Sequence, residues 1–173
     1  MSLDPGSKSG AVDREVGRGG TGLASLFNDA PLPIPAFYRA YLDGETEAMI
    51  ALLHEEVRAT FVGHARLEGK RDTVQFVRFS SGLFQAMDFR PVDVLVDSAG
   101  AAVAWEEVGV TAGGEPWAAH GVDVLTVRDG KIVELVVSGD FRQVRRCLPP
   151  YPGPGGEPRH VDVPVRGSEE RTT

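Results

Sequence analysis

A single carboxylate, Asp123, interrupts an apolar, β-rich run between Trp117 and Val127. The run ends at Asp129-Gly130, a dipeptide that strongly indicates a β-hairpin. A carboxylate within an apolar strand either needs a hydrogen-bonding partner or takes part in a reaction. Apolar walls would raise the pKa of Asp123 toward neutrality, where a carboxyl group can act as a general acid or base.

Two further acidic residues stand side by side in the preceding predicted strand, over 101–110. Because successive side chains of a strand alternate between faces, Glu106 and Glu107 must point to opposite faces, so one of them faces a pocket or an interface. The pattern does not decide which of the two does so. Trp105 and Trp117 could form a wall for a flat ligand, although packing within the sheet explains them equally well.

Two tyrosines, a histidine and the aspartate after the last predicted strand are further candidates for the functional site. Tyr38 and Tyr41 share one stripe of the first predicted helix, so a phenol there could bind a substrate oxygen; core tyrosines with satisfied hydroxyls are the alternative. His120 has the opposite parity to Asp123 and would share its pocket only if the strand contained a bulge. A half-exposed histidine on the outer face is the simpler interpretation. Asp140 follows the last predicted strand and is interpreted first as a helix N-cap.

Composition and charge narrow the functional classes. A chain of 173 residues with 42% hydrophobic content fits one domain with a substantial core. The net charge of -7 argues against a nucleic-acid partner. The single cysteine, Cys147, excludes a disulfide within the chain. No apolar run approaches membrane-spanning length and no signal peptide is recognisable, so we expect a cytoplasmic protein. The histidines and carboxylates lack metal-site spacing, and we expect neither a metal nor a cofactor.

The hydrophobic periodicity is confined to the middle of the chain. Residues 1–30 are therefore predicted to be a disordered extension, 31–148 the folded domain, and 149–173 a flexible tail rich in proline and glycine. Within the domain, the helix over 34–42 carries the apolar stripe Ile34, Phe37, Tyr38, Tyr41 and Leu42. The other predicted elements are a second helix after Asp43-Gly44 with Met49, Ile50, Leu52 and Leu53 facing inward, a strand over 57–62, a loop over 63–69, a helix over 71–83, and strands over 89–96, 101–110, 117–127 and 131–138.

Three helices at the N-terminal side followed mostly by strands indicate an α+β fold, with a curved mixed or antiparallel sheet wrapped over the helices. This order, together with Leu67-Glu-Gly69 and the run from Gly121-Val-Asp-Val through Arg128-Asp-Gly-Lys-Ile-Val-Glu to Asp140, resembles the SnoaL-like polyketide cyclase branch of the nuclear-transport-factor-2-like (ketosteroid-isomerase-like) superfamily. The resemblance covers 32–148. It implies a cone-shaped α+β barrel with a cavity between sheet and helices, and a homodimer formed through the outer sheet face.

The resemblance also implies roles for individual residues. Asp123 matches the strand position at which SnoaL-like cyclases present a pocket histidine. His64 lies in a loop that borders the pocket mouth in this fold; a solvated loop histidine is the alternative. Asp140 resembles an aspartate near the pocket rim. The catalytic aspartate of these cyclases aligns near Val137, which is apolar here. The residues expected to contact substrate are Tyr38, Tyr41, Phe61, Trp105, Trp117, Val137 and Asp140.

The ketosteroid-isomerase base would fall between Thr60 and Val62, where this chain has no carboxylate. No familiar mechanism can therefore be copied onto the chain. The leading hypothesis is a cofactor-independent cyclase or isomerase of secondary metabolism that acts on a hydrophobic, polyketide-type substrate. General acid/base catalysis would use Asp123 with Glu106 or Glu107, assisted by His64 or His120. A non-catalytic binding module is the alternative, and an epoxide hydrolase or dehydratase is the second one.

Overall fold

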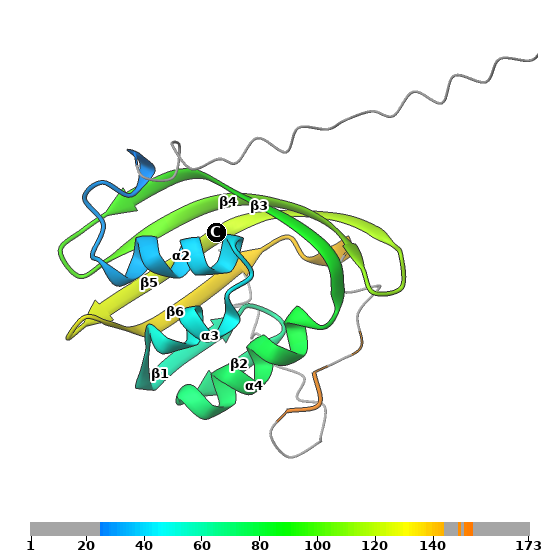
Figure 1. Ribbon diagram of the computed structural model, residues 1–173, viewed down its shortest axis with the longest axis horizontal. Coiled ribbons are helices and arrows are strands. Elements are labelled where there is room, and N and C mark those ends of the chain that lie inside the picture. The colour runs from blue at the N-terminus through cyan, green and yellow to red at the C-terminus, as the bar shows by residue number, and fades with distance from the viewer. Residues whose placement is uncertain (1–24, 144–148, 150, 154–173) are drawn as a thin grey trace, which may run out of the picture.

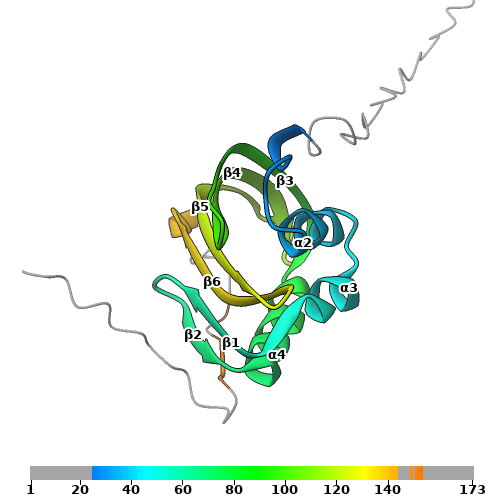
Figure 2. The ribbon, with the colours of Figure 1, turned by 90° about the vertical axis from the view of Figure 1, so that its left-hand side faces the viewer.

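The computed structural model describes residues 25–143, 149 and 151–153, and it shows a curved sheet with the helices on its concave side (Figures 1 and 2). The expected α+β fold, with three N-terminal helices and a curved sheet, is confirmed. The sheet is mixed and has six strands, one more than the five predicted. The helices are α2 (Pro33–Leu42), α3 (Thr46–Ala51) and α4 (Lys70–Ser81). The strands are β1 (Leu53–Phe61), β2 (Ala65–Glu68), β3 (Phe84–Val96), β4 (Gly100–Thr111), β5 (Pro116–Arg128) and β6 (Lys131–Gly139).

The sheet has the strand order β2-β1-β6-β5-β4-β3. β1 and β6 run parallel, and all other neighbours are antiparallel. The predicted hairpin joins β5 to β6, and both of its turn residues have positive φ, 52° at Asp129 and 70° at Gly130. A two-residue turn of this kind needs φ > 0 at both positions, which an Asp-Gly pair tolerates. The turn therefore sets the register of β5 against β6.

The three largest differences from the sequence prediction concern β2, the start of β1 and the start of β3. Residues 65–68, predicted within a loop, form β2 and pair with β1. Leu53, predicted on the second helix, instead begins β1, because its backbone pairs with Ile132 of β6. β3 begins at Phe84 rather than at residue 89, because α4 ends at Ser81 and the chain pairs with the far end of β4 immediately afterwards.

The packed core extends beyond both predicted ends of the domain. Phe27, predicted to lie in a disordered extension, is 3% exposed and stacks on Tyr38 with ring centroids 5.3 Å apart. Tyr151, predicted in the flexible tail, packs against α4, with centroids 5.0 Å from Phe76 and 5.3 Å from Phe79. Residues 1–24 and most of the tail lie outside the described residues. Among the described helices, none is long and apolar enough to cross a membrane.

The burial of Phe27 leads to a stability prediction. Phe27→Ala should lower the free energy of unfolding by about 3 kcal/mol, because it removes a buried ring and leaves a void beside Tyr38. Urea denaturation followed by circular dichroism measures the change. Leu32→Ala is the control: Leu32 is 88% exposed, and its loss should change stability by less than ~0.5 kcal/mol. Equal effects of the two substitutions would show that residues before 31 do not belong to the folded unit.

Candidate active site

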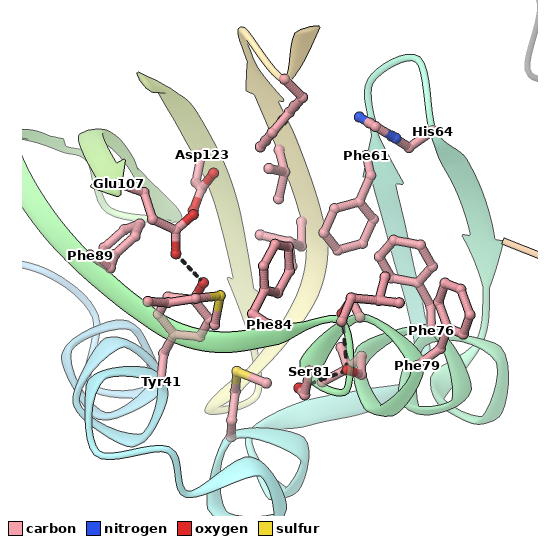
Figure 3. A pocket seen from close by; sticks show the side chains of 18 of the residues that line it. Tyr41, Phe61, His64, Phe76, Phe79, Ser81, Phe84, Phe89, Glu107 and Asp123 are labelled. Carbon is pink, nitrogen blue, oxygen red and sulfur yellow. Dashed lines mark hydrogen bonds between the residues drawn. The ribbon is translucent and has the colours of Figure 1, made fainter. Parts of the chain in front are cut away.

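A cavity of about 540 Å³ opens between the concave face of the sheet and the helices (Figure 3). Its walls are largely aromatic and aliphatic, and its side chains come from all three helices, from β1 and from β3 to β6. This volume suits a drug-sized organic molecule. Two carboxylates lie together on one side of it, and His64 lies on the other side (Figure 3).

Asp123 points into this cavity from β5 and is 7% exposed. The Tyr38 hydroxyl donates a hydrogen bond of 2.8 Å to its Oδ2, and the Trp105 Nε1–H donates one of 2.7 Å to its Oδ1. Burial raises the pKa of Asp123 from 3.8 to about 6, although both hydrogen bonds act to lower it. The carboxyl group is therefore positioned by two donors and titrates close to neutral pH.

Glu107 is the second inward-facing acid and settles the choice that the strand pattern left open. It is 7% exposed, and the Tyr41 hydroxyl donates a 2.7 Å hydrogen bond to its Oε1. Burial raises its pKa from 4.5 to about 7; Tyr41 opposes the rise, and the charge of Asp123 adds to it. The two carboxyl groups thus influence each other electrostatically inside an apolar cavity.

One helix positions both acids. Tyr38 and Tyr41 lie three residues apart on α2, so their side chains occupy the same helical face. Phe89 of β3 lies between them, stacked on Tyr38 at 5.5 Å and edge-on to Tyr41 at 5.1 Å. Burial and the neighbouring carboxylates raise the pKa of both phenols well above 10.0, so the hydroxyls remain protonated donors.

Most of the other predicted contact residues also line the cavity. Val137 of β6 is the direct cross-strand neighbour of Asp123, so the acid of this chain stands one strand away from the position where the resemblance placed one. His64 follows β1 and packs edge-to-face on Phe141, with ring centroids 5.3 Å apart. The remaining predicted residues on the cavity wall are Tyr38, Tyr41, Phe61, Trp105 and Trp117.

Three predicted site residues do not reach the cavity. Glu106 is exposed on the outer face of β4 and forms an ion pair with Arg90 of β3. His120 pairs with Glu106 in register and is exposed on the same outer face, because β5 has no irregularity near it that would turn it inward. Both residues are therefore excluded from a direct role in the cavity.

Asp140 also lies outside the cavity lining. Its Oδ1 accepts a 3.2 Å hydrogen bond from the backbone N–H of Arg142, as expected of a residue that caps the turn beginning there. Its carboxylate also accepts hydrogen bonds from the Arg142 side chain, which hold the pKa of Asp140 at about 2. This geometry explains Asp140 as a local structural group.

The sequence interpretation missed the aromatic wall made by β3 and α4. Phe84 and Phe89 of β3 and Phe76 and Phe79 of α4 all line the cavity (Figure 3). The high density of aromatic residues over 76–89 could have indicated this wall. Because the strand was predicted to begin at residue 89, the residues before it were not assigned to a face of the sheet. Across the part of the chain that the structure describes, no group of three or more histidine, cysteine or acidic residues is arranged to hold a metal ion.

The raised pKa values of Asp123 and Glu107 predict how stability depends on pH. Above their ordinary pKa values of 3.8 and 4.5, the unfolded chain releases protons that the folded chain keeps until about pH 6 and 7. The contribution of the two protonated carboxyl groups to the free energy of unfolding is complete below about pH 4 and is lost as pH rises through 6 to 7. Between about pH 4 and 7, the free energy of unfolding should therefore fall by about 2–4 kcal/mol more in the wild type than in the double variant Asp123→Asn/Glu107→Gln.

Denaturant titrations at a series of pH values measure this difference. The amide introduced by Asp123→Asn can accept from the Trp105 N–H with its oxygen and donate to the Tyr38 hydroxyl, so the variant keeps its hydrogen bonds. If the free energy of unfolding changed with pH by the same amount in both proteins, the raised pKa values would be contradicted.

The sequence of the folded part matches a known family. Residues 34–135, more than half of the chain, match the family model of the SnoaL-like domain. No curated protein sequence matches significantly.

Solved structures share the fold at low sequence identity. A Burkholderia pseudomallei NTF2-like protein of unknown function is 16% identical with a TM-score of 0.61, covering 68% of this chain and 95% of its own. A candidate polyketide cyclase from Pseudomonas putida is 19% identical with a TM-score of 0.58, covering 69% and 97%. An LEH-like epoxide hydrolase from M. tuberculosis is 19% identical with a TM-score of 0.58, covering 70% and 90%. The chain belongs to the SnoaL-like domain family and has the NTF2-like α+β fold.

Proposed function

We propose that this protein is a cofactor-independent enzyme that catalyses proton transfer on a hydrophobic small molecule, as a cyclase or isomerase of secondary metabolism. The observation that carries the proposal is the pair of buried carboxyl groups, Asp123 and Glu107, in one apolar cavity. A module that only binds an uncharged hydrophobic ligand has no need for two acids without a countercharge in its cavity, because their burial costs stability.

The two acids are suited to different roles at neutral pH. With a pKa of about 6, Asp123 is mostly ionised at pH 7 and can accept a proton. Glu107, with a pKa of about 7, is half protonated there and can donate one. Paired carboxyl groups with separated pKa values are a recurrent basis for acid and base roles in one site. Asp123 would remove a proton next to a carbonyl group, and Glu107 would supply one to the developing oxyanion.

The fold accommodates several reactions, since proteins that share it include a candidate polyketide cyclase and an LEH-like epoxide hydrolase. Epoxide opening uses a carboxyl group to activate water or to protonate the epoxide oxygen, and the same pair of acids could serve it. We favour proton transfer at carbon because the hydroxyls of Tyr38 and Tyr41 already donate to the two acids, and the rest of the wall around them is aromatic.

A generic carbon acid tests the proposal without knowledge of the natural substrate. In D2O, the wild type should accelerate hydrogen–deuterium exchange at the carbon next to the carbonyl of 2-tetralone, measured by proton NMR. Asp123→Asn should reduce this rate by about 10²–10⁴-fold, because the base is lost. The rate should be highest at about pH 6 to 7, since it needs Asp123 ionised and Glu107 protonated, and should fall on both sides.

Glu106→Gln is the matched control, because it removes the adjacent carboxylate from the outer face and should leave exchange unchanged. Exchange that is equally fast in wild type and Asp123→Asn would rule out the assigned base. Incubation with styrene oxide provides a second arm: diol formation without ketone exchange would favour the epoxide hydrolase alternative.

We also propose that two copies associate through the outer sheet face. Val108 of β4 is 51% exposed, and Val122 and Val124 of β5 are 40% and 45% exposed, which leaves apolar side chains in contact with water on adjacent strands. Apolar patches of this kind mark interfaces.

Light scattering coupled to gel filtration should therefore give twice the chain mass for the wild type and the single-chain mass for Val122→Glu. Leu32→Glu is the control, since it changes an exposed leucine that is not on the sheet. A wild type that elutes as a monomer would contradict the dimer.

A further inference from the structure

The ionisable side chains of the cavity wall include acids but no lysine or arginine among the described residues. The acids are Asp123 and Glu107. The arginines of the neighbouring elements are directed elsewhere: Arg78 of α4 is paired with Glu47, and Arg90 of β3 with Glu106. Hydrogen bonds from phenols and an indole support the two carboxyl groups, but no fixed positive charge among the described lining residues compensates them.

Aromatic rings surround these acids. Tyr38 and Tyr41 donate to them, and Phe89 packs on both tyrosines and on Trp105, whose ring lies 5.8 Å away. The face of an aromatic ring carries partial negative charge and attracts cations, most strongly when water is excluded. The faces of Tyr38 are covered, because it stacks on both Phe27 and Phe89. Where other rings of the lining turn a face to the cavity, they act in the same direction as the carboxylates, in favour of positive charge.

We propose that the cavity binds a lipophilic organic cation, a protonated arylalkylamine or a quaternary ammonium compound, with its charged nitrogen beside Asp123 and Glu107. This inference rests on the proposed function in one respect, namely that the two acids face the ligand. It names the substrate class, because a substrate or an intermediate that carries positive charge matches the cavity, whereas a carboxylate, phosphate or thioester-linked anion would meet two acids without a countercharge.

Binding of a cation should depend on pH. The titratable side chains that line the cavity are Asp123 of β5, Glu107 of β4, Tyr38 and Tyr41 of α2, His64 after β1, and Tyr151 of the C-terminal segment; those from β3, β6, α3 and α4 are not titratable. A bound cation favours the ionised carboxyl groups and so displaces protons from them. Its affinity should therefore rise with pH as Asp123 and Glu107 ionise, while that of an uncharged ligand should not.

Isothermal titration calorimetry with three matched naphthalene probes tests the proposal. They are (2-naphthylmethyl)trimethylammonium, the uncharged 2-neopentylnaphthalene of the same shape, and 2-naphthylacetate. At pH 7.5, the cation should bind the wild type about tenfold more tightly than its uncharged isostere, and the anion should bind least. This advantage should shrink to less than about threefold at pH 5. Titration in two buffers of different ionisation enthalpy should show that binding of the cation releases protons.

Variants separate the contribution of charge from that of shape. Asp123→Asn/Glu107→Gln should abolish the advantage of the cation and leave the affinity for the uncharged probe unchanged, whereas Glu106→Gln should behave as wild type. If the double variant does not fold, the pH dependence and proton release of the wild type still decide the matter.

Equal affinity for cation and isostere, tighter binding of the anion, or no binding of the cation would overturn the proposal. If such a result were found together with Asp123-dependent exchange of 2-tetralone, only the cationic ligand would be wrong. If the cation bound as expected and exchange did not depend on Asp123, the proposed catalysis would fail and the binding site would remain.

Discussion

Two tyrosine–carboxylate pairs connect α2 to β4 and β5 of the sheet, and the shape of the cavity depends on them. Tyr38 reaches Asp123 across 85 residues of sequence, and Tyr41 reaches Glu107 across 66. Carboxyl groups this deeply buried need donors in order to remain in an apolar interior. The helix supplies these donors at the spacing of one turn, so its position above the sheet and the orientation of both acids are set by the same contacts. A shift of α2 along the sheet would break both pairs at once.

The burial of the two acids favours the proposed catalysis but lowers the stability of the folded protein. Burial makes the carboxyl groups useful near neutral pH, and it also makes the folded state less stable once they ionise. The cavity of about 540 Å³ adds to the cost, because its lining side chains lack protein neighbours on that side. Long antiparallel strands and the chain of aromatic contacts from Phe27 through Tyr38 to Phe89 offset these losses. The binding site and the main aromatic cluster of the core are therefore parts of one structure.

Strand alternation and turn chemistry were sufficient to predict five of the six strands and half of the site. The Asp-Gly turn placed Asp123 on a definite face, and alternation required that either Glu106 or Glu107 point inward. The choice between them depends on which side of the sheet is concave, which local sequence does not determine. The tyrosine–carboxylate pairing joins distant segments and leaves no local signal. β2 was missed because it has only four residues, although the exposed and buried residues of Ala65–Glu68 do alternate.

The most direct test of two desolvated acids in this cavity is a titration of the ¹³C carboxyl shifts of Asp123 and Glu107 by NMR, assigned with single-site variants. We expect midpoints near pH 6 and 7 and mutual perturbation of the two curves, as for interacting groups in an apolar site. Midpoints near the ordinary values of 3.8 and 4.5 would show that both carboxyl groups are solvated, and that the cavity is not the apolar acid/base site described above.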